Sequence, residues 1–215
     1  MVTMKTKLAL LAPCCLAVLG CQYVIGVDDA QPRETEETRE TQGLRWDFSD
    51  TNDARQWSLR DDCGGGNCVN GASLVRDDDV LRLTAPFDAN DEAQAVAVST
   101  EVLAGDIDLT GAVPSLRIRL ASGGFGANAR DGGFDVFIFV YDADWDIAGG
   151  MVGDFPMGDD GSAAEFSLDE PLAIDDNFDP SSIIMVDVRI DTKYWEGATF
   201  GYTEAVFEIE WVAIE

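Results

Sequence analysis

The 215-residue sequence contains no histidine. The Ser-His-Asp and Cys-His arrangements of nucleophilic catalysis need an imidazole as base, and many protein metal centres need imidazole as a ligand. The absence of histidine therefore excludes both kinds of site from this chain.

Lysine and arginine are scarce. The chain has 14 of them against 41 Asp and Glu, a formal net charge of -27. Because nucleic-acid affinity comes mainly from Lys and Arg that neutralise phosphates, this balance argues against a nucleic-acid partner. The remaining composition, with 46% hydrophobic and 26% charged residues, is ordinary for a globular protein and predicts one domain with one core.

Long hydrophobic runs are also missing. The apolar stretch from Leu8 to Leu19, which follows Lys5 and Lys7, is too short for a comfortable transmembrane helix. A positive segment followed by a short apolar one is typical of a secretion signal, and we expect that signal to span residues 1–20.

The expected signal ends in Val18-Leu19-Gly20-Cys21, which resembles the lipobox of bacterial lipoproteins. In that family the residue matching Cys21 carries several acyl chains, palmitate among them, and more than one chain anchors a protein stably to a bilayer. The resemblance implies a lipid-anchored protein of the bacterial cell envelope. Gln22 stands where an Asp would resemble an inner-membrane retention signal, which favours the outer membrane. The alternative is a plain signal peptide in which Cys21 has no role.

Residues 21–42 begin with the expected lipidated cysteine and turn polar from Asp28 onward. Pro32 and a run of Glu, Thr and Arg without apolar periodicity predict an acidic, extended spacer between anchor and domain. A short exposed helix is the alternative.

Cysteine usage agrees with export. Cys14 and Cys15 leave with the signal and Cys21 carries lipid, so Cys63 and Cys68 remain as a pair, separated by three glycines and an asparagine. In an oxidising compartment we expect this pair to form a disulfide. Half of a zinc site is the alternative, but no histidine or further cysteine exists to complete four ligands.

Residues 43–215 consist of short apolar runs separated by Gly, Asp, Asn and Pro clusters, without a long helical stripe. This pattern predicts an all-β domain, a single β-sandwich or jelly roll of about ten antiparallel strands. The expected strands are Leu44–Ser49, Gln56–Leu59, Ala72–Arg76, Val80–Thr84, Ala93–Thr100, Ser115–Ala121, Phe134–Asp142, Ala164–Leu168, Ile183–Asp191 and Ala205–Ile214.

Alternation within the expected strands assigns side chains to faces. In one strand Arg117 and Arg119 lie opposite apolar residues, and in another Asp187, Arg189 and Asp191 do. If the two strands are neighbours, one sheet face carries interleaved Arg and Asp groups. Such a face is either a ligand-binding surface or an ordinary solvated surface with cross-strand ion pairs.

The strand over 134–142 is apolar on both faces, because Phe137, Phe139 and Tyr141 lie opposite another apolar set. Either it is a central strand covered on both sides, or its second face is an aromatic platform that continues to Trp145. Sugar rings stack on flat aromatic surfaces while Asp, Asn and Arg bind their hydroxyls. The candidate ligand-binding residues are Arg117, Arg119, Tyr141, Trp145, Asp187, Arg189, Asp191, Tyr194 and Trp195.

Three passages are similar to jelly-roll carbohydrate-binding modules with the galactose-binding-domain-like fold. They are residues 46–50 with 56–57, residues 107–112 with 116–120, and the closing run 206–214. The resemblance extends over most of residues 44–215, and it implies a sandwich fold and a non-catalytic carbohydrate-binding function.

The same resemblance implies one structural calcium ion between the opening and closing strands. The matching ligands are Asp47 or Asp50 together with Glu210, where the family favours Asp. Carboxylate oxygens suit calcium. A second acidic run, 142–146, matches the first five positions of an EF-hand loop, but Ile147 replaces the required glycine, so we expect a simple loop there.

The sequence also contains one pair of carboxylates that could be considered catalytic. Glu208 and Glu210 share a strand face and resemble the start of a laminarinase-type glycosidase motif, but Val212 and Ala213 stand where a further catalytic glutamate should follow. We therefore expect no enzymatic activity.

These patterns together predict a signal over residues 1–20, a lipidated cysteine and tether over 21–42 and a β-sandwich over 43–215. The expected function is that of an exported, membrane-anchored lipoprotein whose module binds carbohydrate, more readily a neutral polysaccharide than an acidic one. The alternative is a structural or adhesion lipoprotein that binds a protein partner. A groove with exposed aromatic residues among Asp and Arg favours the first function, and an uncovered apolar patch favours the second.

Overall fold

The computed structural model describes most of the chain after residue 42. The described residues are 43–63, 67–77, 79–88, 92–102, 107–127, 129, 131–159, 161–174, 176–195 and 200–215. The predicted signal, Cys21 and the tether lie outside these residues. None of the helices in these ranges is both long enough and apolar enough to cross a membrane.

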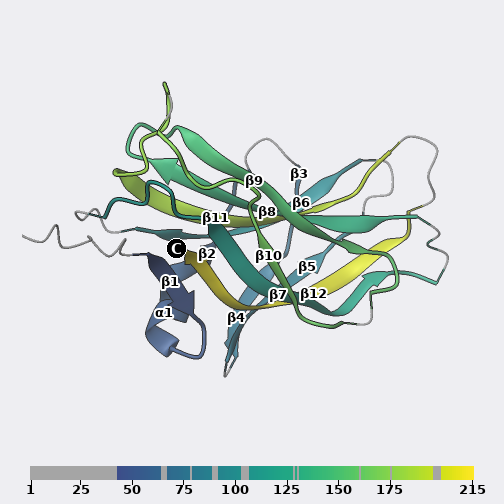
Figure 1. The fold of residues 1–215 in the computed structure, drawn as a ribbon. Helices are drawn as coiled ribbons and strands as arrows, with labels where there is room; N and C mark the ends of the chain where they lie inside the picture. Colours follow the sequence, from purple (N-terminus) through teal and green to yellow (C-terminus); the bar gives the residue numbers. More distant parts are fainter. Residues whose placement is uncertain are drawn as a thin grey trace, which may run out of the picture. The chain divides into compact units, whose positions relative to one another are not determined.

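Within these ranges the chain forms strands and one short helix (Figure 1). In chain order they are β1 (Leu44–Asp47), α1 (Thr51–Gln56), β2 (Trp57–Leu59), β3 (Asn67–Cys68), β4 (Ser73–Asp77), β5 (Val80–Pro86), β6 (Gln94–Glu101), β7 (Pro114–Phe125), β8 (Gly133–Asp142), β9 (Ile147–Pro156), β10 (Ala164–Ser167), β11 (Ile183–Thr192) and β12 (Tyr202–Ile214).

The strands form two six-stranded sheets. Sheet A has the order β10-β7-β12-β5-β4, with β1 beside β12, and sheet B has the order β2-β6-β11-β8-β9, with β3 beside β6. The ladders are antiparallel, apart from the short parallel pairing of β3 with β6. The sheets pack through their apolar faces into a β-sandwich of the jelly-roll type, which confirms the predicted all-β class.

Every strand predicted from the sequence is present, but β3, β9 and α1 were not predicted. The segment of β9 contains Gly149, Gly150 and Gly153 and ends in Pro156, and these residue types are depleted in strands. Helix α1 is a single short stretch that begins after Asp50, whose carboxylate accepts the backbone N–H of Asn52 at 2.7 Å.

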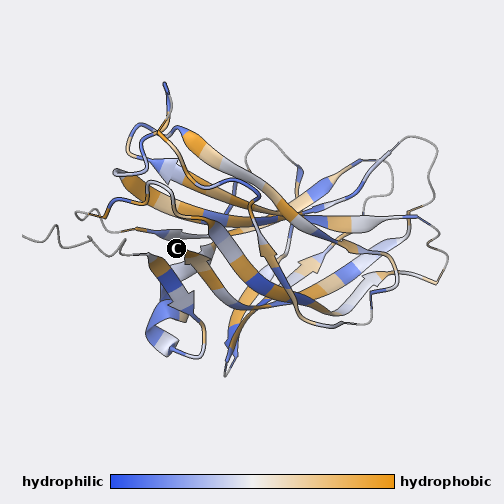
Figure 2. Ribbon diagram, in the orientation of Figure 1, coloured by the Kyte–Doolittle hydropathy of each residue, from blue (hydrophilic) through white to orange (hydrophobic). Residues whose placement is uncertain are grey.

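The inner faces of both sheets form one apolar core (Figure 2). Phe134 of β8 is fully buried, and its ring contacts those of Phe87, Phe125, Tyr202 and Phe207 at centroid distances of 5.2–5.5 Å. Phe87 follows β5, and the other three belong to β7 and β12, so all four partners come from sheet A. Phe134 of sheet B therefore links the two layers.

Strand alternation predicted the inward residues correctly, with one exception. In β7 and β8 the inward side chains are at most 5% exposed: Leu116, Ile118, Leu120, Phe134, Val136, Ile138 and Val140. In β11 the alternation places Ile184 inward, but a register shift between Ile183 and Met185 puts Ile183 in the core instead. A bulge adds one residue to a strand and so reverses the alternation beyond it.

Truncation of Phe134 tests the link between the layers. We expect Phe134→Ala to lower the free energy of unfolding by about 3–5 kcal/mol, because it leaves a cavity among four aromatic rings. Val75, which is 52% exposed, provides a control, and Val75→Ala should change stability by less than about 0.5 kcal/mol. Urea denaturation measures both values, and equal losses in the two variants would contradict this assignment of the core.

Candidate functional site

The outer face of sheet B carries a pair of aromatic rings. Phe137 and Phe139 of β8 point away from the core, and both side chains are only partly buried. Their ring centroids are 5.7 Å apart and their planes differ by 11°, so the two rings are stacked and form one apolar surface feature of this face. We call this surface the Phe137–Phe139 platform.

On one side the platform is bordered by β9. Met151 is in register with Phe137 and is 53% exposed, while Gly149 is in register with Phe139. Gly149 has a φ of +123°, and a Cβ there would collide with the carbonyl oxygen of Ile138. The position therefore requires glycine, and no side chain rises beside Phe139 from this strand.

On the other side the platform is bordered by β11, where Asp187 is in register with Phe139 and Arg189 with Phe137. Asp187 is 2% exposed, and its Oδ2 accepts a hydrogen bond from Arg60 Nη1 at 2.8 Å and a longer one from the Tyr141 hydroxyl at 3.5 Å. Arg60 also donates to the Tyr141 hydroxyl at 3.1 Å. A buried carboxylate is thus held at the base of the face by a guanidinium and a phenol.

The carboxyl of Asp187 has a perturbed pKa. Burial raises it to about 6, against the opposing effect of Arg60. Its Oδ1 atom is buried and has no hydrogen-bond partner in the described part of the chain. Burial also raises the pKa of the neighbouring Tyr141.

Arg189 is fixed over the platform by hydrogen bonds of its guanidinium group. Its Nε and Nη2 donate to the two carboxylate oxygens of Asp191, each at 2.6 Å, and its Nη1 donates to the carbonyl of Cys63 at 2.5 Å. The guanidinium carbon lies 6.0 Å from the centroid of the Phe137 ring. Burial raises the pKa of Asp191.

The predicted disulfide is present beside this site. Cys63 and Cys68 are bonded, with their Cα atoms 5.5 Å apart. A cavity of about 600 Å³ lies next to the disulfide, and the side chains that line it are acidic, amide or aliphatic, with no aromatic ring among the described ones.

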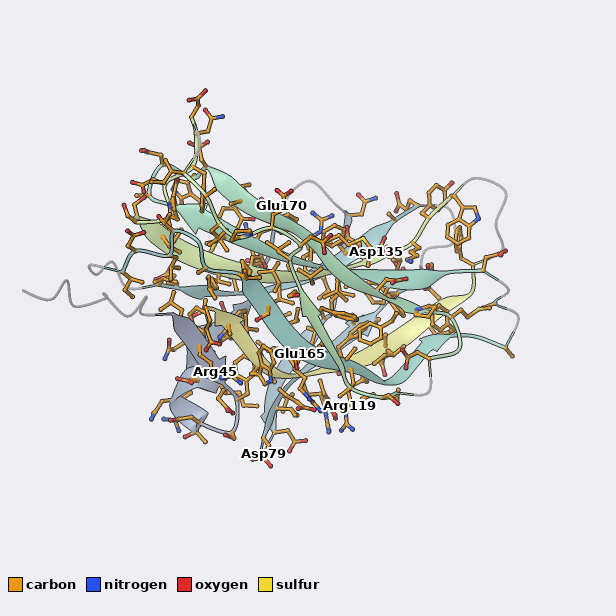
Figure 3. All side chains as sticks on the ribbon, in the orientation of Figure 1. Arg45, Asp79, Arg119, Asp135, Glu165 and Glu170 are labelled. Carbon is orange, nitrogen blue, oxygen red and sulfur yellow. A yellow bond between two sulfur atoms is a disulfide. The ribbon has the colours of Figure 1, made fainter. Side chains whose placement is uncertain are left out.

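The structure separates the charged residues that the sequence grouped together. Arg117 and Arg119 lie on β7 of sheet A, whereas Asp187, Arg189 and Asp191 lie on β11 of sheet B. The prediction of one interleaved Arg and Asp face is therefore wrong, because the outer faces of a sandwich point in opposite directions. Figure 3 shows Arg119 and Asp135, which belong to the two outer faces, on opposite sides of the sheets.

On sheet A the arginines form ion pairs with glutamates. Arg117 Nε lies 2.8 Å from Glu210 Oε2, and Glu208 accepts hydrogen bonds from Arg119 at 2.5 Å and from Arg82 at 2.7 Å. Burial alone would raise the pKa of Glu208, but these hydrogen bonds outweigh it and lower the pKa. The two glutamates considered as a catalytic pair are thus bound by arginine.

The remaining aromatic candidates lie in different places. Trp145 is 61% exposed, and its ring centroid lies 6.1 Å from that of Tyr141, which is itself only 7% exposed. Tyr194 and Trp195 follow β11 and are 44% and 45% exposed. Both pack against Phe200, at centroid distances of 5.5 and 5.0 Å.

The three expected calcium ligands have separate protein partners. Asp47 Oδ1 accepts hydrogen bonds from the backbone and side chain of Ser49, Asp50 caps α1, and Glu210 pairs with Arg117. Among the described residues no group of three Asp, Glu or Cys side chains is arranged to hold a metal ion. The residues present therefore do not fit a calcium site as they stand, and calcium binding stays a prediction.

Sequence reasoning missed Arg60 and Met151. Arg60 directly follows a three-residue strand and Met151 lies in the glycine-rich β9, so neither belongs to a recognisable alternating pattern. Phe137 and Phe139 were recognised as a platform or as a covered strand face. Their partial exposure supports the platform.

No protein-family model matches the sequence, and no match was found among curated proteins. Solved structures with similar folds include xylanase 10C from Cellvibrio japonicus in complex with xylopentaose, at a TM-score of 0.43 and 15% identity; the match covers 80% of this chain and 28% of that one. This chain thus spans 28% of the xylanase.

Two further similar structures are single modules. The xylan-binding module CBM15 has a TM-score of 0.41 and 17% identity, over 74% of this chain and 94% of that module. TmCBM27, described for specific mannan recognition, has a TM-score of 0.42 and 7% identity, over 80% and 96%. At these identities and scores the similarity does not tell what this chain binds.

The raised pKa of Asp187 predicts a pH dependence of stability. Its value of about 6 in the folded protein exceeds the ordinary 3.8, so between these values the folded state holds a proton that the unfolded state has released. The stabilising contribution of the protonated form is therefore lost as the pH rises, and a shift of about 2 pKa units corresponds to about 3 kcal/mol. From about pH 4 to about pH 7 we expect wild type to lose about 2–3 kcal/mol relative to Asp187→Asn, by urea denaturation at each pH. A difference between the two proteins that does not change with pH would contradict the assignment.

Proposed function

We propose that the outer face of sheet B binds a neutral polysaccharide on the Phe137–Phe139 platform. The observation that carries the proposal is the pair of near-parallel, partly exposed rings, 5.7 Å apart, beside fixed charged groups. The apolar C–H face of a sugar ring stacks on such a surface. The hydrogen-bonding groups of Arg189 and Asp191, next to the platform, are suited to its hydroxyls.

The charge arrangement supports a neutral ligand. On this face Arg60 is paired with Asp187, Arg189 with Asp191, and Lys193 with Asp154 at 2.6 Å. On sheet A, Arg117 and Arg119 are paired with glutamates. An anionic glycan would compete with these carboxylates for every guanidinium and would approach a chain with net charge -27.

We also propose that the module is not catalytic and that its ligand is a glycan rather than a protein. Glu208 and Glu210, the carboxylates that resembled a glycosidase pair, lie on sheet A and are bound by arginine. On its β11 side the platform borders the charged side chains of Asp187 and Arg189. This arrangement favours a sugar over an adhesion partner, which would need a wider uncovered apolar patch.

The sequence of residues 1–42 supports the proposal that the module is held at the outer membrane of a bacterial cell envelope. The lipobox-like Val18-Leu19-Gly20-Cys21 would supply the anchor, and the acidic run that follows would keep the domain away from the membrane. The disulfide agrees with an oxidising compartment outside the cytoplasm.

Binding of neutral polysaccharides tests the proposed function. The protein, titrated with xylan, mannan, β-glucan and galactan, should bind at least one of them, and an anionic control such as polygalacturonate should bind more weakly. Phe139→Ala should weaken binding roughly ten- to a hundredfold, because it removes one of the two rings of the stacking surface. Val75→Ala on the other sheet should leave affinity unchanged. No binding in the whole series, or no effect of Phe139→Ala, would contradict the proposal.

Metabolic labelling tests the anchor. In a bacterial host that expresses the full chain, radioactive palmitate should label the wild-type protein and not Cys21→Ala, because that substitution removes the acylated sulfur. Cys14→Ala, inside the signal, is the matched control and should keep its label. Equal labelling of wild type and Cys21→Ala would show that Cys21 is not the acylated residue.

A further inference from the structure

Trp145 has an unusual backbone conformation. Its φ is +67°, and it is the sole non-glycine residue with a positive φ among the described residues. It lies in the turn between β8 and β9, where its N–H donates to the carbonyl of Asp142 at 3.0 Å and the N–H of Asp142 donates to the carbonyl of Asp146 at 3.1 Å. Glycine or asparagine is the usual residue at such a position, and a bulky aromatic residue is strained there.

A buried carboxylate holds this turn in place. Asp142 is 2% exposed, and its Oδ1 accepts the backbone N–H groups of Asp144 at 3.0 Å and Asp146 at 2.9 Å. Its Oδ2 accepts the N–H of Asp179 at 3.0 Å, which connects the turn to the segment before β11. The surrounding structure thus compels the conformation of Trp145.

Packing of the indole does not account for the strain. Trp145 is 61% exposed, and among the described residues its ring contacts that of Tyr141 edge-on at 6.1 Å. Ile147, in register with Tyr141, is itself 55% exposed. A large apolar ring is therefore held in water by a strained turn, which is the kind of feature that accompanies a binding site.

The position of Trp145 relates it to the platform. Phe137, Phe139 and Tyr141 are alternate residues of one strand and lie on the same face. With a rise of about 3.3 Å per residue, Phe137 and Tyr141 are about 13 Å apart along β8, and Trp145 lies beyond that end. Phe139, the nearer ring of the platform, is about 7 Å from Tyr141 along the strand, and the centroid of the indole lies 6.1 Å from that of the Tyr141 ring.

We propose that Trp145 is the distal contact of an extended polysaccharide chain that runs along β8 from the Phe137–Phe139 platform to the β8–β9 turn. This inference rests on the proposed function. It specifies in addition that the bound polysaccharide runs parallel to β8 and is long enough to reach the β8–β9 turn. The face takes an internal stretch of a linear chain, and units far from the platform gain affinity through the indole.

Affinity as a function of ligand length tests this inference. Calorimetric titration with cello-, xylo- and manno-oligosaccharides of two to six units should show that the series that binds gains affinity in two stages, first on the platform and then on Trp145. In Trp145→Gly the shortest ligand that binds should keep its wild-type affinity, while the longest should lose about tenfold. Val75→Ala, at an exposed apolar residue of sheet A outside the proposed site, should keep the whole length dependence.

Thermal unfolding without ligand gives a second measurement. Glycine tolerates a positive φ, so Trp145→Gly should unfold at the same temperature as wild type or a higher one. A clearly lower temperature would mean that the indole serves stability and would overturn the inference. If Trp145→Gly keeps the length dependence of wild type while Phe139→Ala weakens binding as expected, the inference is overturned and the proposed function stands. No binding by wild type in any series would overturn the proposed function, and the inference with it.

Discussion

The structure depends on the alternation of one strand. Because β8 buries Phe134, Val136, Ile138 and Val140 against sheet A, its other residues must point outward. The alternation that places Phe134 in the core between the two sheets therefore also places Phe137 and Phe139 on the outer face of sheet B. Any shift of register by one residue would bury the platform and expose the core, so stability and the binding surface are specified together.

The charged side chains around the platform follow from the extreme composition. With few basic residues against many acidic ones, each arginine described on the two outer faces has a carboxylate within ion-pair distance. On sheet A these pairs engage Glu208, and on sheet B they flank the rings. The excess acid spreads over the rest of the surface, where it favours solubility and repels like-charged polymers.

The sequence predicted the fold and the residues of individual strands, because alternation and turn residues are local signals. It did not predict which strands are neighbours, and this is why Arg117 and Arg119 were grouped with Asp187 and Arg189. It did not predict β9 either, because the glycines of that strand interrupt the alternation of polar and apolar residues by which a strand is recognised. Arg60 reaches Asp187 across a sequence separation of 127 residues, and no local signal reports such a contact.

The hydrogen bonds that fix Arg189 have a consequence for binding. A free arginine side chain loses up to about 2 kcal/mol of rotamer entropy when it is fixed. Here Asp191 and the Cys63 carbonyl fix it in the free protein, and the disulfide restrains the segment that carries this carbonyl. The side chain of Arg189 is thus already ordered in the folded, disulfide-bonded protein. A ligand that contacts Arg189 therefore loses less affinity to the entropy of ordering this side chain.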